Sequence, residues 1–275
     1  MKLEQLERVD LYDRFKEHLK TPIILSNMNF KGGSSKTATT VLQAYELSLN
    51  GFKVLTIDND AQANLTEFLL QEREFEYDIS DVLLNGVEIE KAIISATDNL
   101  DIIPSSLNYV YLDDINRSSY SNKHILNSFK RKIDSIKHQY DFIFIDVPPS
   151  ININIKLALE VCTDINIVVQ TKMPSFFGSE KLISWLNSYL HENSLDINLI
   201  GVIRTLTDKN KLKHKEVYNL IYDHYKDLTY NNFVDYSDRI DYFSNHGIDE
   251  NEYWSKVVLR RFNDLNYEML ERICE

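Results

Sequence analysis

Short apolar segments that alternate with helical segments constrain this sequence more than any other feature. Six such segments span residues 21–28, 53–58, 99–104, 141–146, 164–170 and 197–203, and helical stretches lie between them. Strands that are apolar along their whole length are buried on both faces, as in a parallel sheet covered by helices on both sides. The sequence therefore predicts an α/β fold with a doubly wound, mostly parallel sheet flanked by helices.

The chain divides into a short N-terminal extension and one main domain. Apolar residues at helical spacing over 3–19 predict a helical extension at residues 1–20, which packs on the domain or forms a dimer contact. The main domain covers residues 21–275 and ends in a helical tail from about Glu252. No internal repeat or linker rich in Gly, Ser or Pro interrupts it, so a single domain is expected.

Composition excludes several classes of protein. With 30 basic and 42 acidic residues the net charge is -12, which argues against a surface that is basic overall, although a local basic patch remains open. The two cysteines, Cys162 and Cys274, have no disulfide or zinc-site spacing. A charged N-terminus and the lack of any apolar run near 20 residues predict a cytoplasmic protein without a membrane partner.

Polar clusters follow three of the apolar segments. They lie at residues 31–37, at Asp58 and Asp60, and at residues 146–150. In a parallel sheet the ligand binds beyond the carboxyl ends of the strands. The three clusters should therefore meet at one edge of the sheet, as a nucleotide site requires.

The first cluster, KGGSSKT at residues 31–37, has the chemistry of a phosphate-binding loop. Backbone N–H groups of the turn and of the helix start can point at an anion, Lys36 adds positive charge and Thr37 can bind Mg²⁺. The strict pattern G-x-x-x-x-G-K-[ST] fails, because its glycine positions hold Phe30 and Ser35. The general motif alone therefore leaves nucleotide binding open.

A family resemblance resolves this ambiguity. KGGSSKT resembles the deviant Walker A box KGGVGKT of the ParA/MinD family, VLTIDNDAQANLTEFL is similar to VLLIDLDPQGNAT, and YDFIFIDVPPSININI is similar to YDYIIIDCPPSLG. With SDVLLNG, DINIVVQTKMPSFFGSEKL and LIGVIRTLTD in family order, the resemblance covers about residues 21–250. It implies a P-loop NTPase fold, ATP and Mg²⁺ as cofactors, and a slow, partner-stimulated ATPase that partitions plasmids or chromosomes.

The resemblance also implies roles for individual residues. The nucleotide-binding residues would be Lys31, Gly32, Gly33, Ser34, Ser35, Lys36, Thr37 and Ala38. The residues implied in catalysis are Lys31, Lys36 and Asp60, and Lys31 would reach the partner's ATP across a homodimer. The implied Mg²⁺ site uses Thr37, Asp58, Asp60 and Asp146. Asp58 and Asp60 are expected on the same side of an extended chain end.

Two departures from the family pattern leave two functions open. Ser35 replaces a glycine and Ala61 replaces a proline, and a side chain at position 35 should crowd the phosphate or strain the backbone. The first function is an ATPase whose ATP-bound dimer binds DNA and is reset by hydrolysis. The alternative is a nucleotide-locked or nucleotide-independent DNA-binding or regulatory scaffold with little turnover.

The resemblance implies non-specific DNA as one partner and a ParB-like centromere-binding protein as another. Candidate DNA-contacting side chains are Lys209, Lys211, Lys213, Lys215, Arg239, Arg260 and Arg261, with a second cluster at Lys130, Arg131 and Lys132. Each cluster can equally be a solvated helix face. Acidic residues also crowd the late region and weaken any positive field there: Asp235, Asp238, Asp241, Asp249 and Glu250.

The C-terminal helix carries an apolar face with two possible uses. Its members are Trp254, Val258, Phe262, Leu265, Met269 and Ile273. A MinD-like membrane helix is one use, but acidic residues on the polar face weaken attraction to anionic lipid. Packing on the core is therefore expected. A nitrogenase-like reductase is disfavoured because the cysteines that hold its cluster are missing.

Overall fold

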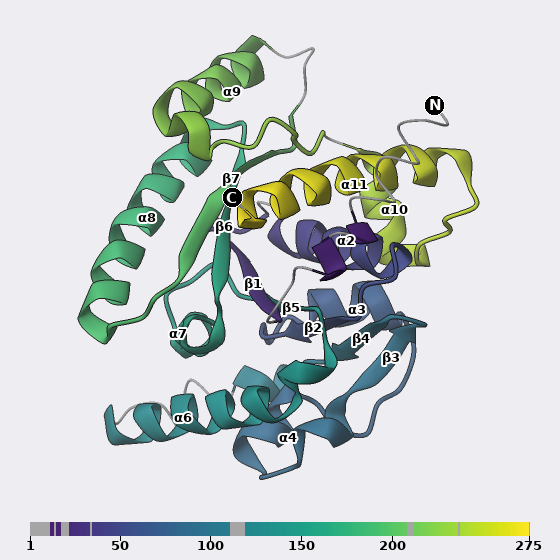
Figure 1. Cartoon of the computed structure of the whole chain (residues 1–275), viewed down its shortest axis with the longest axis vertical. Helices are drawn as coiled ribbons and strands as arrows, with labels where there is room; N and C mark the ends of the chain where they lie inside the picture. Colours follow the sequence, from purple (N-terminus) through teal and green to yellow (C-terminus); the bar gives the residue numbers. More distant parts are fainter. Residues whose placement is uncertain are drawn as a thin grey trace.

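A seven-stranded sheet forms the centre of the molecule (Figure 1). The computed structural model describes residues 12–13, 15–17, 22–33, 35–110, 119–207, 212–235 and 237–274. The strand order is β3-β4-β2-β5-β1-β6-β7, and all neighbours are parallel except β3 with β4. The strands are β1 (Ile23–Met28), β2 (Val54–Asp58), β3 (Ile94–Thr97), β4 (Leu100–Ile103), β5 (Phe142–Asp146), β6 (Asp164–Gln170) and β7 (Asn198–Thr205).

Helices cover both faces of the sheet (Figure 1). The α-helices with described bounds are α2 (Lys36–Leu49), α3 (Asn64–Leu70), α4 (Ile79–Leu84), α6 (Ser119–Ile136), α7 (Ile153–Val161), α8 (Met173–Asn193), α9 (Leu212–Tyr225), α10 (Asp238–His246) and α11 (Tyr253–Cys274). Short 3₁₀ turns are η1 (Ile89–Ala92), η2 (Leu107–Val110), η3 (Lys137–Gln139) and η4 (Lys226–Leu228). The predicted doubly wound α/β fold is confirmed, and each predicted apolar segment contains one strand.

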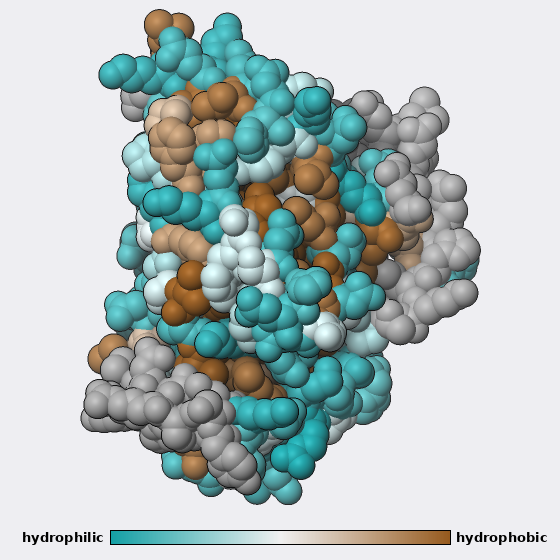
Figure 2. Space-filling view, turned by 90° about the vertical axis from the view of Figure 1, so that its left-hand side faces the viewer, coloured by the Kyte–Doolittle hydropathy of each residue, from teal (hydrophilic) through white to brown (hydrophobic). Residues whose placement is uncertain are grey.

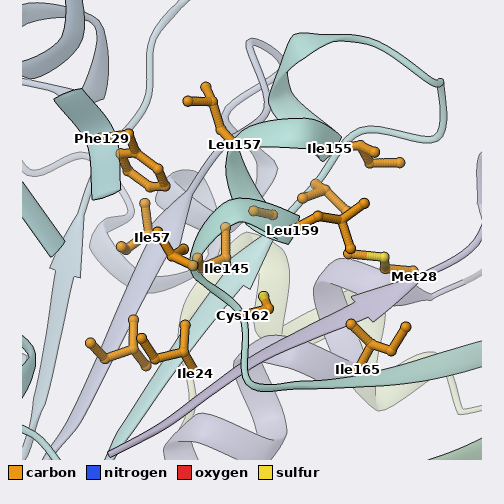
Figure 3. Close-up of a cluster of buried hydrophobic side chains, with 14 of the residues drawn as sticks. Ile24, Met28, Ile57, Phe129, Ile145, Ile155, Leu157, Leu159, Cys162 and Ile165 are labelled. Carbon is orange, nitrogen blue, oxygen red and sulfur yellow. The ribbon is translucent and has the colours of Figure 1, made fainter. Parts of the chain in front are cut away.

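Alternate side chains of each central strand enter two separate cores. On β1, Ile24 and Met28 belong to the core on one face, and Ile23 and Leu25 belong to the core on the other. Figure 3 shows the first of these cores, where apolar side chains of β1, β2, β5 and β6 meet those of α6 and α7. The second core lies under α2, α10 and α11. Burial on both faces explains why the strands lack an alternating polar pattern.

The strand β3 was not predicted. Its residues Ile94–Thr97 are only partly buried, and it runs antiparallel to β4 at the edge of the sheet with an irregular register. A short, half-exposed edge strand has no continuous apolar run. The segment Ile94–Thr97 therefore lacks the apolar run that predicts each of the other six strands.

The C-terminal helix α11 packs on the core, as expected. Val258, Phe262, Leu265 and Met269 are at most 5% exposed, whereas Trp254, at the start of the same predicted face, is 62% exposed. Within the described ranges, no helix combines the length and apolar character needed to span a membrane. The apolar face of α11 thus completes the second core.

The last turns of α11 also hold the loop at residues 226–232, which follows α9 and lies beside β7. Glu268 accepts hydrogen bonds from the backbone N–H groups of Asn231 and Asn232 at 2.7 and 2.8 Å. Arg272 donates to the carbonyl oxygens of Asp227 and Thr229, both at 2.9 Å. The carboxylate and the guanidinium also pair with each other at 2.9 Å, so one ion pair closes the loop.

Part of the predicted N-terminal extension is described. Tyr12 and Phe15 are helical and buried, and the Tyr12 ring meets Phe52 edge to face at 5.8 Å. Residues 1–11 lie outside the described residues. The contact with Phe52 agrees with packing on the domain, and the boundary at residue 20 stays a prediction.

A buried carboxylate in α2 predicts an unusual pH dependence of stability. Glu46 is 6% exposed and accepts a hydrogen bond from Asn263 at 3.2 Å. Burial raises the pKa of Glu46 from 4.5 to about 7, and the nearby Glu250 carboxylate adds to this effect. The folded state therefore binds the proton more tightly than the unfolded state. Its contribution to stability is fully present below about pH 4.5 and is lost as pH rises through about 7.

The variant Glu46→Gln should raise the free energy of unfolding by about 2 kcal/mol at pH 8, since a neutral amide avoids most of the cost of a buried charge. At pH 5 the gain should nearly vanish. Urea unfolding at both pH values measures this difference. Glu271→Gln, which changes an exposed carboxylate of α11, is the control and should show no pH-dependent gain. An equal effect of Glu46→Gln at pH 5 and pH 8 would contradict the assignment.

Candidate functional site

The phosphate-binding loop connects β1 to α2 at the carboxyl edge of the sheet. Asn29, directly after β1, accepts a hydrogen bond from the Lys31 N–H at 2.8 Å and donates to the carbonyl of Val168 on β6. Gln170, the last residue of β6, donates to the carbonyl of Gly33. Two amide side chains thus tie the loop to the neighbouring strand. Neither was predicted, because their partners lie more than 130 positions away.

The expected strain at Ser35 is present. Its φ is 65° and its ψ is 22°, in the left-handed region, and Gly33 has a φ of 68°. An L-residue pays for this conformation because its Cβ crowds the carbonyl oxygen, whereas glycine does not. The loop therefore holds a left-handed conformation with a residue that does not favour it. Ser34 lies outside the described residues.

Replacing Ser35 by glycine should raise the free energy of unfolding by roughly 0.5–1 kcal/mol, because the relieved strain exceeds the added freedom of the unfolded chain. ATP affinity should rise as well, since the side chain leaves the phosphate end of the loop. Ser194→Gly is a matched control, because Ser194 ends α8 with a φ of 54°. It should give the same gain in stability without a change in ATP affinity. Identical unfolding curves for Ser35→Gly and wild type would rule out stored strain.

Lys36, Thr37 and Asp146 meet at the start of α2. The Thr37 hydroxyl donates to the Asp146 carboxylate at 2.7 Å, which joins the loop to the end of β5. Lys36 is 6% exposed, and its burial lowers the pKa of its ammonium group while the Asp146 and Asp60 carboxylates oppose that shift. A buried cation at a helix start, with carboxylates beside it, is the arrangement that binds a phosphate–metal pair.

The residues present fit a magnesium ion. Asp146 Oδ1 is buried without a hydrogen-bond partner among the described residues, although burial is costly for a carboxylate oxygen. Burial also raises the pKa of Asp146 to about 6, partly offset by the Thr37 hydrogen bond. A hydrated Mg²⁺ beside Thr37 would supply the missing partner and favour the ionised carboxylate. Thr37 and Asp146 therefore form the best-supported half of the predicted metal site.

The sequence predicted Asp58 and Asp60 on the same side of an extended chain end. This prediction is wrong. The strand β2 ends at Asp58, and the chain turns immediately, with the Asp60 N–H donating to Asp58 Oδ1 at 3.2 Å. Asp58 is fully buried, and its other oxygen accepts from the N–H and the hydroxyl of Thr66, both at 2.8 Å. Burial and the neighbouring Asp146 raise the pKa of Asp58 to about 7. Asp58 thus anchors α3, and Asp60 faces the cavity.

A cavity of about 540 Å³ opens beside the loop. Its floor is formed by predicted residues, namely Gly32, Gly33, Ser35, Lys36, Thr37 and Ala38, with Asp60 at one side. Its walls come from two helices: Asn64, Glu67 and Phe68 of α3, and Ile240, Asp241, Ser244 and Asn245 of α10, with Ser237 just before it. The α3 residues lie in the matched segment at residues 54–69, although no site role was predicted for them, and the α10 wall residues were not predicted, since only the fold brings α10 to the loop.

The candidate DNA-contacting side chains fall into different environments. Arg239 pairs with Glu252 at 3.0 Å and stacks on the Tyr242 ring at 4.3 Å, and Arg261 pairs with Asp235 at 2.6 Å. Lys213, Lys215 and Arg260 are exposed. Lys209 and Lys211 lie outside the described residues. The α6 cluster, Lys130 to Lys132, and the α9 lysines lie at opposite ends of the molecule, so they cannot form one patch (Figure 1).

The fold and this site define the class of the protein: a P-loop nucleotide-binding protein of the deviant Walker A type. A family model described as an AAA domain matches residues 23–199. The sporulation initiation inhibitor protein Soj of Bacillus subtilis is 26% identical over 226 residues, which are 82% of this chain and 88% of Soj. A ParA family protein of Chlamydia muridarum is 32% identical over 177 residues, 63% of this chain and 68% of that protein. The chain belongs to the ParA/MinD-type family of partitioning ATPases.

Solved structures agree on the fold. McdA of Cyanothece in complex with ATP matches with a TM-score of 0.79 at 20% identity, over 90% of this chain and 96% of McdA. A putative plasmid partition protein of Borrelia burgdorferi, bound to AMPPNP, matches with a TM-score of 0.73 at 23% identity, over 90% of this chain and 99% of that protein. Both neighbours were solved with an adenine nucleotide or its analogue bound.

Proposed function

We propose that this protein is an ATP-driven partitioning switch: it binds Mg²⁺ and ATP, dimerises around the nucleotide, binds DNA as the dimer, and is reset by slow hydrolysis. The observation that carries the proposal is the 2.7 Å hydrogen bond between Thr37 and Asp146 beside the buried Lys36. It joins the phosphate loop to the strand carboxylate in the arrangement that phosphoryl transfer needs. Family membership supports the same conclusion.

The roles of the residues follow from their positions. Lys36 neutralises phosphate charge from the floor of the cavity, and the N–H groups at the start of α2 point at the same anion. Thr37 and Asp146 would hold Mg²⁺, whose charge would stabilise the transferring phosphoryl group. Asp60 lines the cavity beside Lys36 and orients or activates the attacking water. Lys31, half-exposed at the loop's start, is free to reach the nucleotide of a second subunit.

Apolar side chains at the carboxyl edge of the sheet support the dimer. Leu107, Ile151, Met173 and Phe177 are 40–71% exposed and follow the ends of β4, β5 and β6. They share this edge with Lys31 and the mouth of the cavity. Figure 2 shows that the side bearing α8 also presents apolar side chains between hydrophilic ones. Burying four such residues against a second copy would favour association.

DNA binding and the partner protein are the least constrained parts of the proposal. Lys213 and Lys215 at the start of α9, Arg260 on α11, and Lys130 and Arg131 on α6 are exposed candidates for phosphate contacts. Arg239 and Arg261 instead have acidic partners within the chain. A ParB-like protein at a centromere-like site is the expected stimulator of hydrolysis. The expected location is the cytoplasm, on the nucleoid when DNA is bound.

The alternative is a nucleotide-locked scaffold with little turnover. The strained Ser35 favours it, because an L-residue in the left-handed region beside the phosphates can hold the loop away from its reactive geometry. In that case ATP would still fix the dimer. The two functions differ in turnover, not in binding.

Phosphate release and size-exclusion chromatography separate these functions. Wild-type protein is incubated with Mg²⁺ and ADP, ATP or a non-hydrolysable ATP analogue, with and without DNA of random sequence. An ATP-dependent dimer with phosphate release supports the switch, and the same dimer without release supports the scaffold. A monomer that binds no nucleotide in any condition would contradict both.

A further inference from the structure

The nucleotide cavity extends beyond the phosphate loop into a section walled by α10. Lys36 and Thr37 mark the end that binds phosphates. The helix α10 lines the same cavity with residues spaced along one face, Ile240 and Asp241 and then Ser244 and Asn245. A nucleotide whose phosphates lie on the loop can place its sugar and base in the remaining section, which α3 and α10 line.

Asp241 is the carboxylate that α10 contributes to this wall, and its side chain is exposed, as is that of Glu67 on α3. Its carboxylate has no hydrogen-bond or ion-pair partner among the described residues, although its backbone carbonyl accepts from Ser244 and Asn245. The phosphate end is formed by the loop and the start of α2, whereas Asp241 lies on α10, a different wall of the cavity. A carboxylate only accepts hydrogen bonds and repels phosphate. The nucleotide groups that match it are donors, and the two ribose hydroxyls can engage both of its oxygens.

Asp241 can also stabilise the N-terminus of α10, and this effect must be distinguished from nucleotide binding. Asp241 lies in the first turn of α10, where a negative charge is favourable at the helix N-terminus. Asp238 lies in the same turn, is also exposed, and is absent from the cavity lining. The two residues therefore share the helix effect and differ in their access to the cavity.

We propose that Asp241 is a nucleotide-binding residue that accepts hydrogen bonds from the ribose hydroxyls, so that α10 forms the nucleoside wall of the site. The proposal rests on the proposed function, because it needs a nucleotide on the phosphate loop. It adds a second point of contact, on an element about 200 positions further along the chain than the loop.

Calorimetric binding tests this assignment with four ligands: ATP, 2′,3′-dideoxy-ATP, ITP and inorganic triphosphate, all with Mg²⁺. Wild type should bind dideoxy-ATP about 10-fold more weakly than ATP, as expected when a hydrogen bond to a charged group is lost. Asp241→Asn should bind ATP about 10-fold more weakly than wild type and bind dideoxy-ATP and triphosphate as wild type does. Asp238→Asn is the matched control and should resemble wild type with every ligand.

Other outcomes would overturn the ribose assignment. An equal loss for ATP and dideoxy-ATP in Asp241→Asn would mean that the carboxylate acts through its general charge. Loss of the preference for ATP over ITP would mean that it reads the base. The same loss in Asp238→Asn would assign the effect to the start of the helix. Failure of wild type to bind even triphosphate would instead reject the phosphate loop, and with it both proposals.

Discussion

Replacing Asp60 by alanine is expected to lower ATP turnover at least about 100-fold and to leave ATP binding nearly unchanged, because a group that positions or activates water acts mainly in the transition state. Asp60 lines the cavity, and one of its oxygens is tied by the Gln62 N–H at 3.0 Å. Its orientation is therefore fixed by the turn after β2. Phosphate release and nucleotide titration measure the two quantities separately.

Two further variants serve as comparisons for Asp60→Ala. Lys36→Ala should lose ATP binding itself, because it removes the buried cation of the loop. Glu67→Ala removes another carboxylate of the same cavity, on α3, and should leave turnover within about 3-fold of wild type. With ATP, Asp60→Ala should accumulate as a dimer on size-exclusion chromatography. Turnover near the wild-type rate in Asp60→Ala would move the water-positioning role to another residue.

Gly201→Ala is expected to be the most destabilising single-methyl change in β7, at about 3 kcal/mol or more, through overpacking. A Cβ at this position would lie 2.4 Å from the Leu228 carbonyl oxygen and 2.9 Å from the Tyr230 ring. The loop cannot simply retreat, because Arg272 and Glu268 hold it from α11. Thermal unfolding should show a midpoint lower by about 6–12 °C.

The matched control makes the same change where space exists. Gly178 lies within α8, and a Cβ there would meet its nearest atom, Asn29 Oδ1, at 3.7 Å. Gly178→Ala should be neutral or stabilising by up to about 1 kcal/mol, since alanine favours a helix. A midpoint for Gly201→Ala within 1–2 °C of wild type, roughly the effect of an ordinary surface change, would show that the loop at residues 226–232 moves more easily than its contacts suggest.

Local sequence patterns were sufficient to predict the buried strands of the sheet and the strain in the phosphate-binding loop. The buried strands were visible because burial on both faces leaves continuous apolar runs, and the strain at Ser35 followed from one residue replacing a glycine. The antiparallel β3 was not detected for the opposite reason, since all four of its residues are at least partly exposed. The structure of a segment is predictable here where the segment's own residue types reflect its burial or its backbone conformation.

Long-range contacts account for what was missed. No local feature of Gln170 or Asn29 shows that they hold the phosphate loop, and nothing near Asp241 indicates a cavity. The same holds for Arg239, whose family match suggested DNA while Glu252 and Ser255 engage its guanidinium in the folded chain. Trp254 was expected in the core and is exposed, whereas the next residue, Ser255, is buried and accepts hydrogen bonds from Arg239.

The supports of the phosphate loop have a consequence for biosynthesis. A ribosome completes residues 30–37 early, but Asp146, Val168 and Gln170, which hold that loop, emerge more than 100 residues later. At about 5–20 residues per second, this delay lasts several seconds or more. Throughout it, the growing chain carries a complete nucleotide motif that has no partners to shape it. Nucleotide can therefore assist folding only after β6 has left the exit tunnel, as a late ligand and not as a nucleus.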